Sequence, residues 1–186
     1  AFDIEGLGAK QIELFFNDAD LPVKAPADIF TLAARDEANG LKRLKNRDGF
    51  GEVSVKKLFA AIEAKRRIPL DRLIFSLGIR HVGEVASGLL ARHYGTWAAF
   101  EAAITHADPD SPQWAELNAI DGVGAVLAGA LVAAFQNPAE RGAIDRLVAE
   151  LEVQPVIARA PVDSPVAGKT VVFTGTLERM TRAEAK

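Results

Sequence analysis

Four short glycine turns recur along the sequence of 186 residues, and each stands at the start of a stretch with helical periodicity. They lie in segments 4–8, 47–51, 80–83 and 120–124. Two glycines flank one apolar residue in the first, second and fourth segments, whereas His81 replaces the first glycine in the third. Paired glycines permit a tight turn whose apolar residue plugs between two helices. The repeat therefore predicts a tandem array of helix–turn–helix units.

Apolar spacing and start signals predict helices for most of the chain. Residues 55–62 and 70–77 carry apolar side chains at positions i, i+3, i+4 and i+7. Ser111-Pro112 and Asn137-Pro138 each combine a capping side chain with proline at the first helical position. With 49% apolar and 25% charged residues, the composition is that of a globular protein and excludes global disorder.

The pattern changes after residue 151. Three prolines within residues 153–165 predict an extended linker. Residues 168–175 form a β-rich stretch that ends in a turn signal, and the residues up to 186 are too few to bury a core. We expect a helical domain over 1–151, a linker over 152–165 and the incomplete start of a second domain over 166–186. The sequence is therefore expected to be a fragment of a longer protein.

The net charge of −3 conceals an uneven distribution. Residues 42–80 carry eleven basic and four acidic side chains, a net charge of +7, whereas residues 1–41 and 93–186 each sum to −5. A polyanion would therefore meet one positive zone. A solvated helical surface explains the same charges, so charge alone does not decide the function.

The second glycine of each turn precedes a helix N-terminus. Free backbone N–H groups there point outward and suit a phosphate, which also needs close approach to the backbone. An ordinary interhelical turn is the alternative for any single unit.

At these turns the sequence resembles the helix-hairpin-helix family, which binds DNA without sequence specificity through backbone contacts to phosphates near the minor groove. The resemblance extends to the C-terminal half of bacterial NAD-dependent DNA ligases, and it covers the whole chain. It is carried by the order of the segments 2–8, 26–30, 77–84, 122–124 and 164–175. It implies a mainly α fold, a tandem helix-hairpin-helix array of four units, followed by a linker and the start of an α/β BRCT domain.

The resemblance also implies a function. Such ligases seal nicks in DNA during replication and repair: NAD adenylylates a lysine, AMP moves to the 5′-phosphate, and the 3′-hydroxyl displaces AMP. The adenylated lysine, the oligonucleotide-binding fold and a four-cysteine zinc finger lie upstream in that family, and this chain has no cysteine. We expect no catalytic residue, metal or cofactor here, although the parent would use NAD, magnesium and zinc. The expected partner is nicked duplex DNA, bound by a monomer in the bacterial cytoplasm near the nucleoid and away from any membrane.

The apolar turn residues Leu7, Phe50, Val82 and Val123 are expected in the core and not at the DNA. The residues expected to contact DNA form three groups. Phosphate is expected at the turn glycines Gly6, Gly8, Gly49, Gly51, Gly83, Gly122 and Gly124. Phosphate is also expected at the basic side chains Lys45, Arg47, Lys56, Lys57 and Arg80. A weaker phosphate site is expected at Thr174 and Gly175.

Two alternatives to the ligase hypothesis remain. Helix-hairpin-helix units also serve as packing elements, so the chain could be a protein-interaction module. The same array also occurs in other DNA repair proteins, such as a nuclease or a branch-migration subunit.

Overall fold

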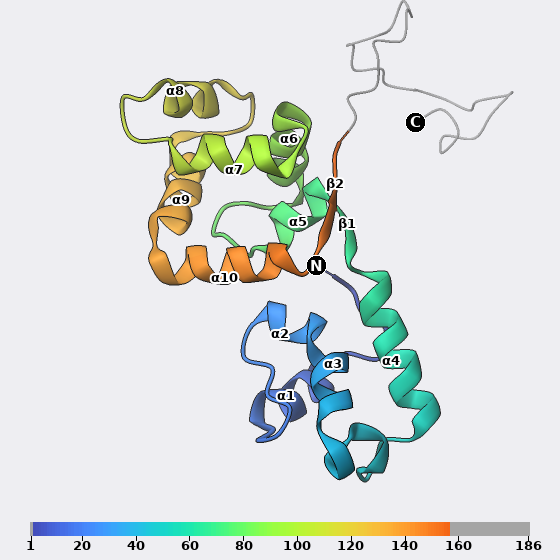
Figure 1. Ribbon diagram of the computed structural model, residues 1–186. Coiled ribbons are helices and arrows are strands. Elements are labelled where there is room, and N and C mark those ends of the chain that lie inside the picture. The colour runs from blue at the N-terminus through green and yellow to red at the C-terminus, as the bar shows by residue number, and fades with distance from the viewer. Residues whose placement is uncertain (1, 157–186) are drawn as a thin grey trace, which may run out of the picture.

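The computed structural model describes residues 2–156, and the mainly helical prediction is confirmed (Figure 1). No helix in this part of the chain is long and apolar enough to cross a membrane. The first group of helices is α1 (Ala9–Asn17), α2 (Pro26–Phe30), α3 (Leu32–Ala38) and α4 (Glu52–Ala64), with 3₁₀ turns at Gly40–Lys42 and Leu44–Asn46. The second group is α5 (Leu70–Ser76), α6 (Glu84–Tyr94), α7 (Trp97–Thr105), α8 (Pro112–Ala119), α9 (Ala125–Gln136) and α10 (Pro138–Ala149).

Two of the helix starts follow directly from the predicted caps. The Ser111 hydroxyl accepts a hydrogen bond from the Trp114 N–H at 3.0 Å, and α8 begins at the next residue. The Asn137 side chain accepts from the Ala139 N–H at 2.9 Å and opens α10 in the same way. Each cap satisfies N–H groups that have no partner within the helix.

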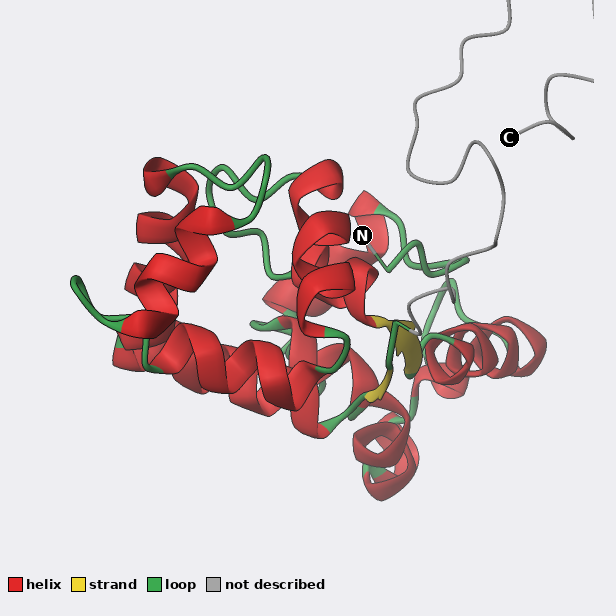
Figure 2. Cartoon of the chain, turned by 90° about the horizontal axis from the view of Figure 1, so that it is seen from above, coloured by secondary structure: helices red, strands yellow, loops and turns green. Residues whose placement is uncertain are grey.

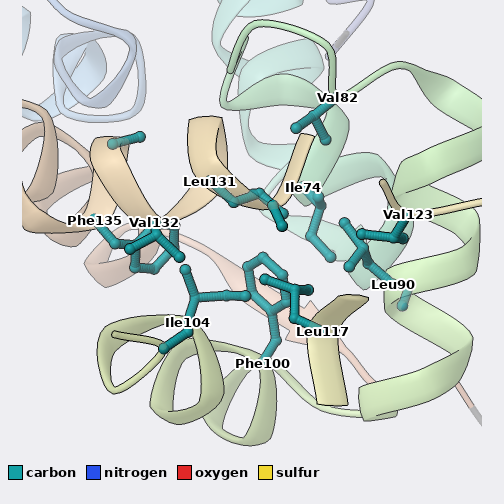
Figure 3. Packing of buried hydrophobic residues seen from close by; sticks show 14 of the residues in the cluster. Ile74, Val82, Leu90, Phe100, Ile104, Leu117, Val123, Leu131, Val132 and Phe135 are labelled. Atoms are coloured by element: carbon teal, nitrogen blue, oxygen red, sulfur yellow. The ribbon is translucent and has the colours of Figure 1, made fainter. Parts of the chain in front are cut away.

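Each group of helices is built around a hydrophobic core, and Leu73 of α5 and Leu147 of α10 also contribute to the core of the first group. Phe15, Phe30 and Leu44 are fully buried in the core of the first group. Leu90, Phe100 and Leu131 are fully buried in the second, where side chains from α5 to α10 converge (Figure 3). Trp97 and Val148 pack against both cores, so the two groups are continuous.

A short parallel sheet joins the two groups. Strand β1 (Arg67–Pro69) pairs with β2 (Glu152–Gln154), in a register that places Ile68 opposite Val153 (Figure 2, yellow). The sequence predicts linker from residue 152, but residues 152–154 are a strand that packs with the domain. A strand of three residues is too short to leave a period-2 signal.

Arg66 ties together three helix ends beside this sheet. Its guanidinium donates hydrogen bonds to the Phe30 carbonyl at the end of α2, and to the Glu150 carbonyl (2.8 Å) and carboxylate (3.0 Å) after α10. A further bond of 2.7 Å reaches Glu63 within α4. One side chain thus links both groups.

Several apolar side chains of α1 are exposed to solvent. Phe15 is fully buried, whereas Ile12, Leu14 and Phe16 remain substantially exposed.

Candidate nucleic-acid interface

The four glycine turns share one backbone geometry. In each, the apolar residue donates its N–H to the carbonyl three residues earlier, at 2.9 to 3.1 Å. The intervening third residue has a positive φ, namely 80° at Gly6, 82° at Gly49, 69° at His81 and 85° at Gly122. This conformation favours glycine, and histidine tolerates it better than most residues do. His81 therefore leaves the third turn in the same shape as the others.

The second glycine of each turn behaves differently. Gly8, Gly51, Gly83 and Gly124 are helix N-caps with φ between −83° and −114°, which any residue adopts. A Cβ would come no closer than 3.5 Å to another atom at Gly8 and 4.0 Å at Gly51, and it would meet open space at the other two. The fold therefore does not require glycine at these four positions.

The apolar turn residues separate the turns into two pairs. Val82 and Val123 are buried in the core of the second group, which confirms the prediction for them (Figure 3). Leu7 and Phe50 pack against the first core and are only partly buried. The first and second turns thus belong to one group of helices, and the third and fourth to the other.

Open hollows lie beside the turns. A groove of about 660 Å³ runs between the first and second turns, and its lining includes Gly6, Gly49 and Lys57. A shallower hollow of about 550 Å³ follows the backbone of residues 118–124 at the fourth turn. In both places the turn backbone is accessible from outside.

Four of the five predicted basic residues are available to a ligand. Lys45, Lys56, Lys57 and Arg80 are exposed and form no ion pair with any residue in 2–156. Arg47 differs, because it pairs with Asp18 and Asp20 and its side chain is only 22% exposed. Its guanidinium supports the second turn from within the protein, so its prediction as a phosphate contact is not supported.

Most other cations of the positive zone are also neutralised. Lys42, Arg43, Arg66, Arg67 and Arg72 each lie within 4 Å of a carboxylate. The positive zone of residues 42–80 therefore has far fewer unpaired basic side chains than its net charge of +7 suggests. Sequence reasoning missed this because the partners, such as Asp18 for Arg47, lie far away along the chain.

The structure brings only some of the predicted cations together. Lys45 and Lys56 line one hollow of about 270 Å³ with the buried carboxylate of Asp36. Asp36 accepts the Leu44 N–H at 2.6 Å and so positions the segment before the second turn. Arg80 lies in the third turn, within the other group of helices.

Two acidic residues begin helices at the site. Glu52 and Glu84 follow the second glycines of the second and third turns, where a carboxylate competes with phosphate for the helix N-terminus. Arg72 holds Glu84 at 3.0 Å and offsets its charge. The first and fourth turns have alanine at this position.

Residues 2–156 contain no cluster of three His, Asp or Glu side chains that could hold a metal ion, and the chain has no cysteine. The residues of this stretch therefore do not fit the family's zinc site. Thr174 and Gly175 lie outside the described residues.

Comparison with known proteins agrees with the resemblance found in the sequence. A family profile for the helix-hairpin-helix motif matches residues 72–144, which include the third and fourth turns. The whole chain is 62% identical to a DNA ligase of Cereibacter sphaeroides and 58% identical to one of Agrobacterium fabrum. The resemblance to the C-terminal region of bacterial DNA ligases is thereby confirmed. A DNA ligase of Rhizobium meliloti is 55% identical over the full chain, and the chain spans about a quarter of the length of these ligases.

Proposed function

We propose that the domain binds the phosphate backbone of duplex DNA, without sequence preference, within a ligase that seals nicks in replication and repair. The observation that carries this proposal is the set of second glycines, which the backbone does not need. A residue without a side chain at four equivalent N-caps is explained if a ligand approaches the backbone closely from outside. Phosphate suits these positions because free N–H groups and the helix dipole favour an anion.

Electrostatics support the same ligand. Lys45, Lys56, Lys57 and Arg80 carry charge that nothing in 2–156 neutralises, and phosphate contacts of this kind provide affinity without reading sequence. The fourth turn lies in residues 93–140, which contain no lysine or arginine. Contacts there would use backbone N–H groups, which a count of charged side chains does not register.

The proposal extends to the parent protein in line with its relatives. Nick sealing would use NAD, magnesium and a structural zinc finger, all outside this stretch, and the stretch itself would hold DNA and perform no chemistry. We propose a monomer on nicked duplex in the nucleoid.

Fluorescence anisotropy on nicked and intact duplexes of unrelated sequence tests the proposal. About four phosphates neutralised by these cations would give a slope of roughly −3 to −4 for log affinity against log salt concentration. The triple variant Lys45→Gln, Lys56→Gln, Lys57→Gln should weaken the slope by about 2 to 3. Arg146→Gln in α10 is the matched control, because its described partner is only the Gly142 carbonyl. A slope near zero, or equal affinity for a neutral polymer, would contradict DNA binding.

A protein-interaction module is the second candidate. The exposed apolar residues Ile12, Leu14 and Phe16 on α1 favour it, because such a face can pack on another protein. Cross-linking to protein in preference to nicked DNA would support this candidate over the first.

A further inference from the structure

Three of the four turns present the same exposed apolar side chain. Valine stands two residues after the second glycine, as Val53 in α4, Val85 in α6 and Val126 in α9. These valines are 69%, 78% and 70% exposed. The first turn has the exposed residue Lys10 at this position.

The fold does not account for these valines. Val55, Ser87 and Ala128, two residues further on, are buried, so each helix directs the earlier position away from the protein interior. Valine is a weaker helix former than alanine or glutamate, and its methyl groups gain nothing in water. A single exposed valine needs no explanation, but the same residue at the same position of three turns does.

The position of each valine limits what it can meet. It lies in the first helical turn, beside the N–H groups to which the proposed function assigns a phosphate. Along a DNA strand the group next to a phosphate is deoxyribose, whose C–H edges are apolar and identical for every base. A valine side chain fits such a surface and reads no sequence from it.

We infer that Val53, Val85 and Val126 pack against deoxyribose of a DNA duplex, beside the phosphates held by the turns. This inference rests on the proposed function and extends it to the sugar. It also implies selectivity, because the 2′-hydroxyl of RNA would place a polar group against the methyl groups.

The triple variant Val53→Ala, Val85→Ala, Val126→Ala tests the inference in the full chain. Alanine removes the methyl groups, adds no polar group and favours helix. We expect roughly tenfold weaker binding to duplex DNA, since three small apolar contacts are lost, although the higher helix propensity of alanine should leave the fold as stable as the wild type or more so. The slope of affinity against salt should stay unchanged, because no charge is removed.

Two controls separate a sugar contact from general effects. Val→Ile at the same three positions should retain binding, and Leu41→Ala removes an exposed apolar side chain that lies outside the turns. Circular dichroism should show the wild-type helix content for every variant, and the triple alanine variant should melt no lower than the wild type. An equal loss of DNA affinity from Leu41→Ala would contradict a specific role for the three valines.

An RNA duplex of the same sequence gives an independent readout. The wild-type chain should prefer DNA, and the triple alanine variant should lose much of that preference. If the wild type binds DNA and the variant binds equally well, with the same preference, the sugar contact is wrong and the proposed function stands. If the wild type binds no duplex, the proposed function fails and this inference with it.

Discussion

At the scale of single residues, the two glycines of a turn meet different demands. Gly49 has a positive φ that the turn itself requires, whereas Gly51 has an ordinary extended conformation with room for a side chain. The sequence shows both glycines as one motif. Only backbone angles and the space around each Cα separate the glycine that builds the turn from the glycine that leaves its surface bare.

The substitutions Gly49→Ala and Gly51→Ala test this distinction within one turn. Gly49→Ala should lower the free energy of unfolding by about 1–2 kcal/mol, because alanine is strained at positive φ. Gly51→Ala should change the free energy of unfolding by no more than about 1 kcal/mol, because alanine is a poorer N-cap residue than glycine but restricts the unfolded chain, and it should weaken duplex binding. Urea denaturation and anisotropy measure the two effects. Comparable destabilisation by both substitutions would show that the fold needs both glycines.

At the scale of elements, the end of α1 is joined to the second turn. The Asp18 carboxylate follows α1 and accepts the N–H groups of Asp20 (2.9 Å) and Leu21 (2.7 Å), and it pairs with Arg47. Burial raises the pKa of Asp18, but the two backbone hydrogen bonds and Arg47 outweigh it and lower the pKa below its ordinary value of 3.8. The ionised carboxylate therefore stabilises the first group of helices.

Asp18→Asn should destabilise the protein in a pH-dependent way. The folded-state pKa lies below the unfolded one, so the stabilisation is complete above about pH 3.8 and is lost as the pH falls through the folded-state value. The difference in unfolding free energy between wild type and Asp18→Asn should be largest near neutral pH and shrink in acid. Denaturation at several pH values measures it, with Asp145→Asn on α10 as the control. A difference that does not change with pH would contradict this role of Asp18.

At the scale of the whole molecule, the two pairs of turns are held together by the junction beside β1 and β2. Arg66 connects α2, α4 and the end of α10, and the Glu152 N–H donates to the Arg66 carbonyl at 2.8 Å. Trp97 and Val148 add contacts to both cores. A single duplex that met all four turns would depend on this junction for their spacing.

Arg66→Ala should lower the free energy of unfolding by about 2 kcal/mol or more, because it leaves the Phe30 and Glu150 carbonyls without these partners. Arg67→Ala is the matched control, since its ion pair with Glu152 is exposed and contributes at most about 1 kcal/mol. Urea denaturation compares the two. Equal effects would mean that the junction depends on other contacts.

Much of the fold was predictable because helical periodicity, caps and glycine turns are local signals. The starts of α8 and α10, the positions of the four turns and the burial of Val82 and Val123 follow from neighbouring residues. The strand at 152–154 was not predictable, since its partner lies more than eighty residues away and three residues carry no period. The ion pair of Arg47 was not predictable either, because its partner Asp18 is 29 residues away in the sequence.

By itself, the sequence determined that the chain is helical and where its four turns fall, because each depends on a few adjacent residues. It also determined how much charge the chain carries. Only the tertiary structure decided which charges remain free, since folding brings Asp18 to Arg47 and leaves Lys57 without a described partner. The tertiary structure also decided which glycines are required by a positive φ and which have room for a side chain, because that depends on the backbone angles and on the space around each residue.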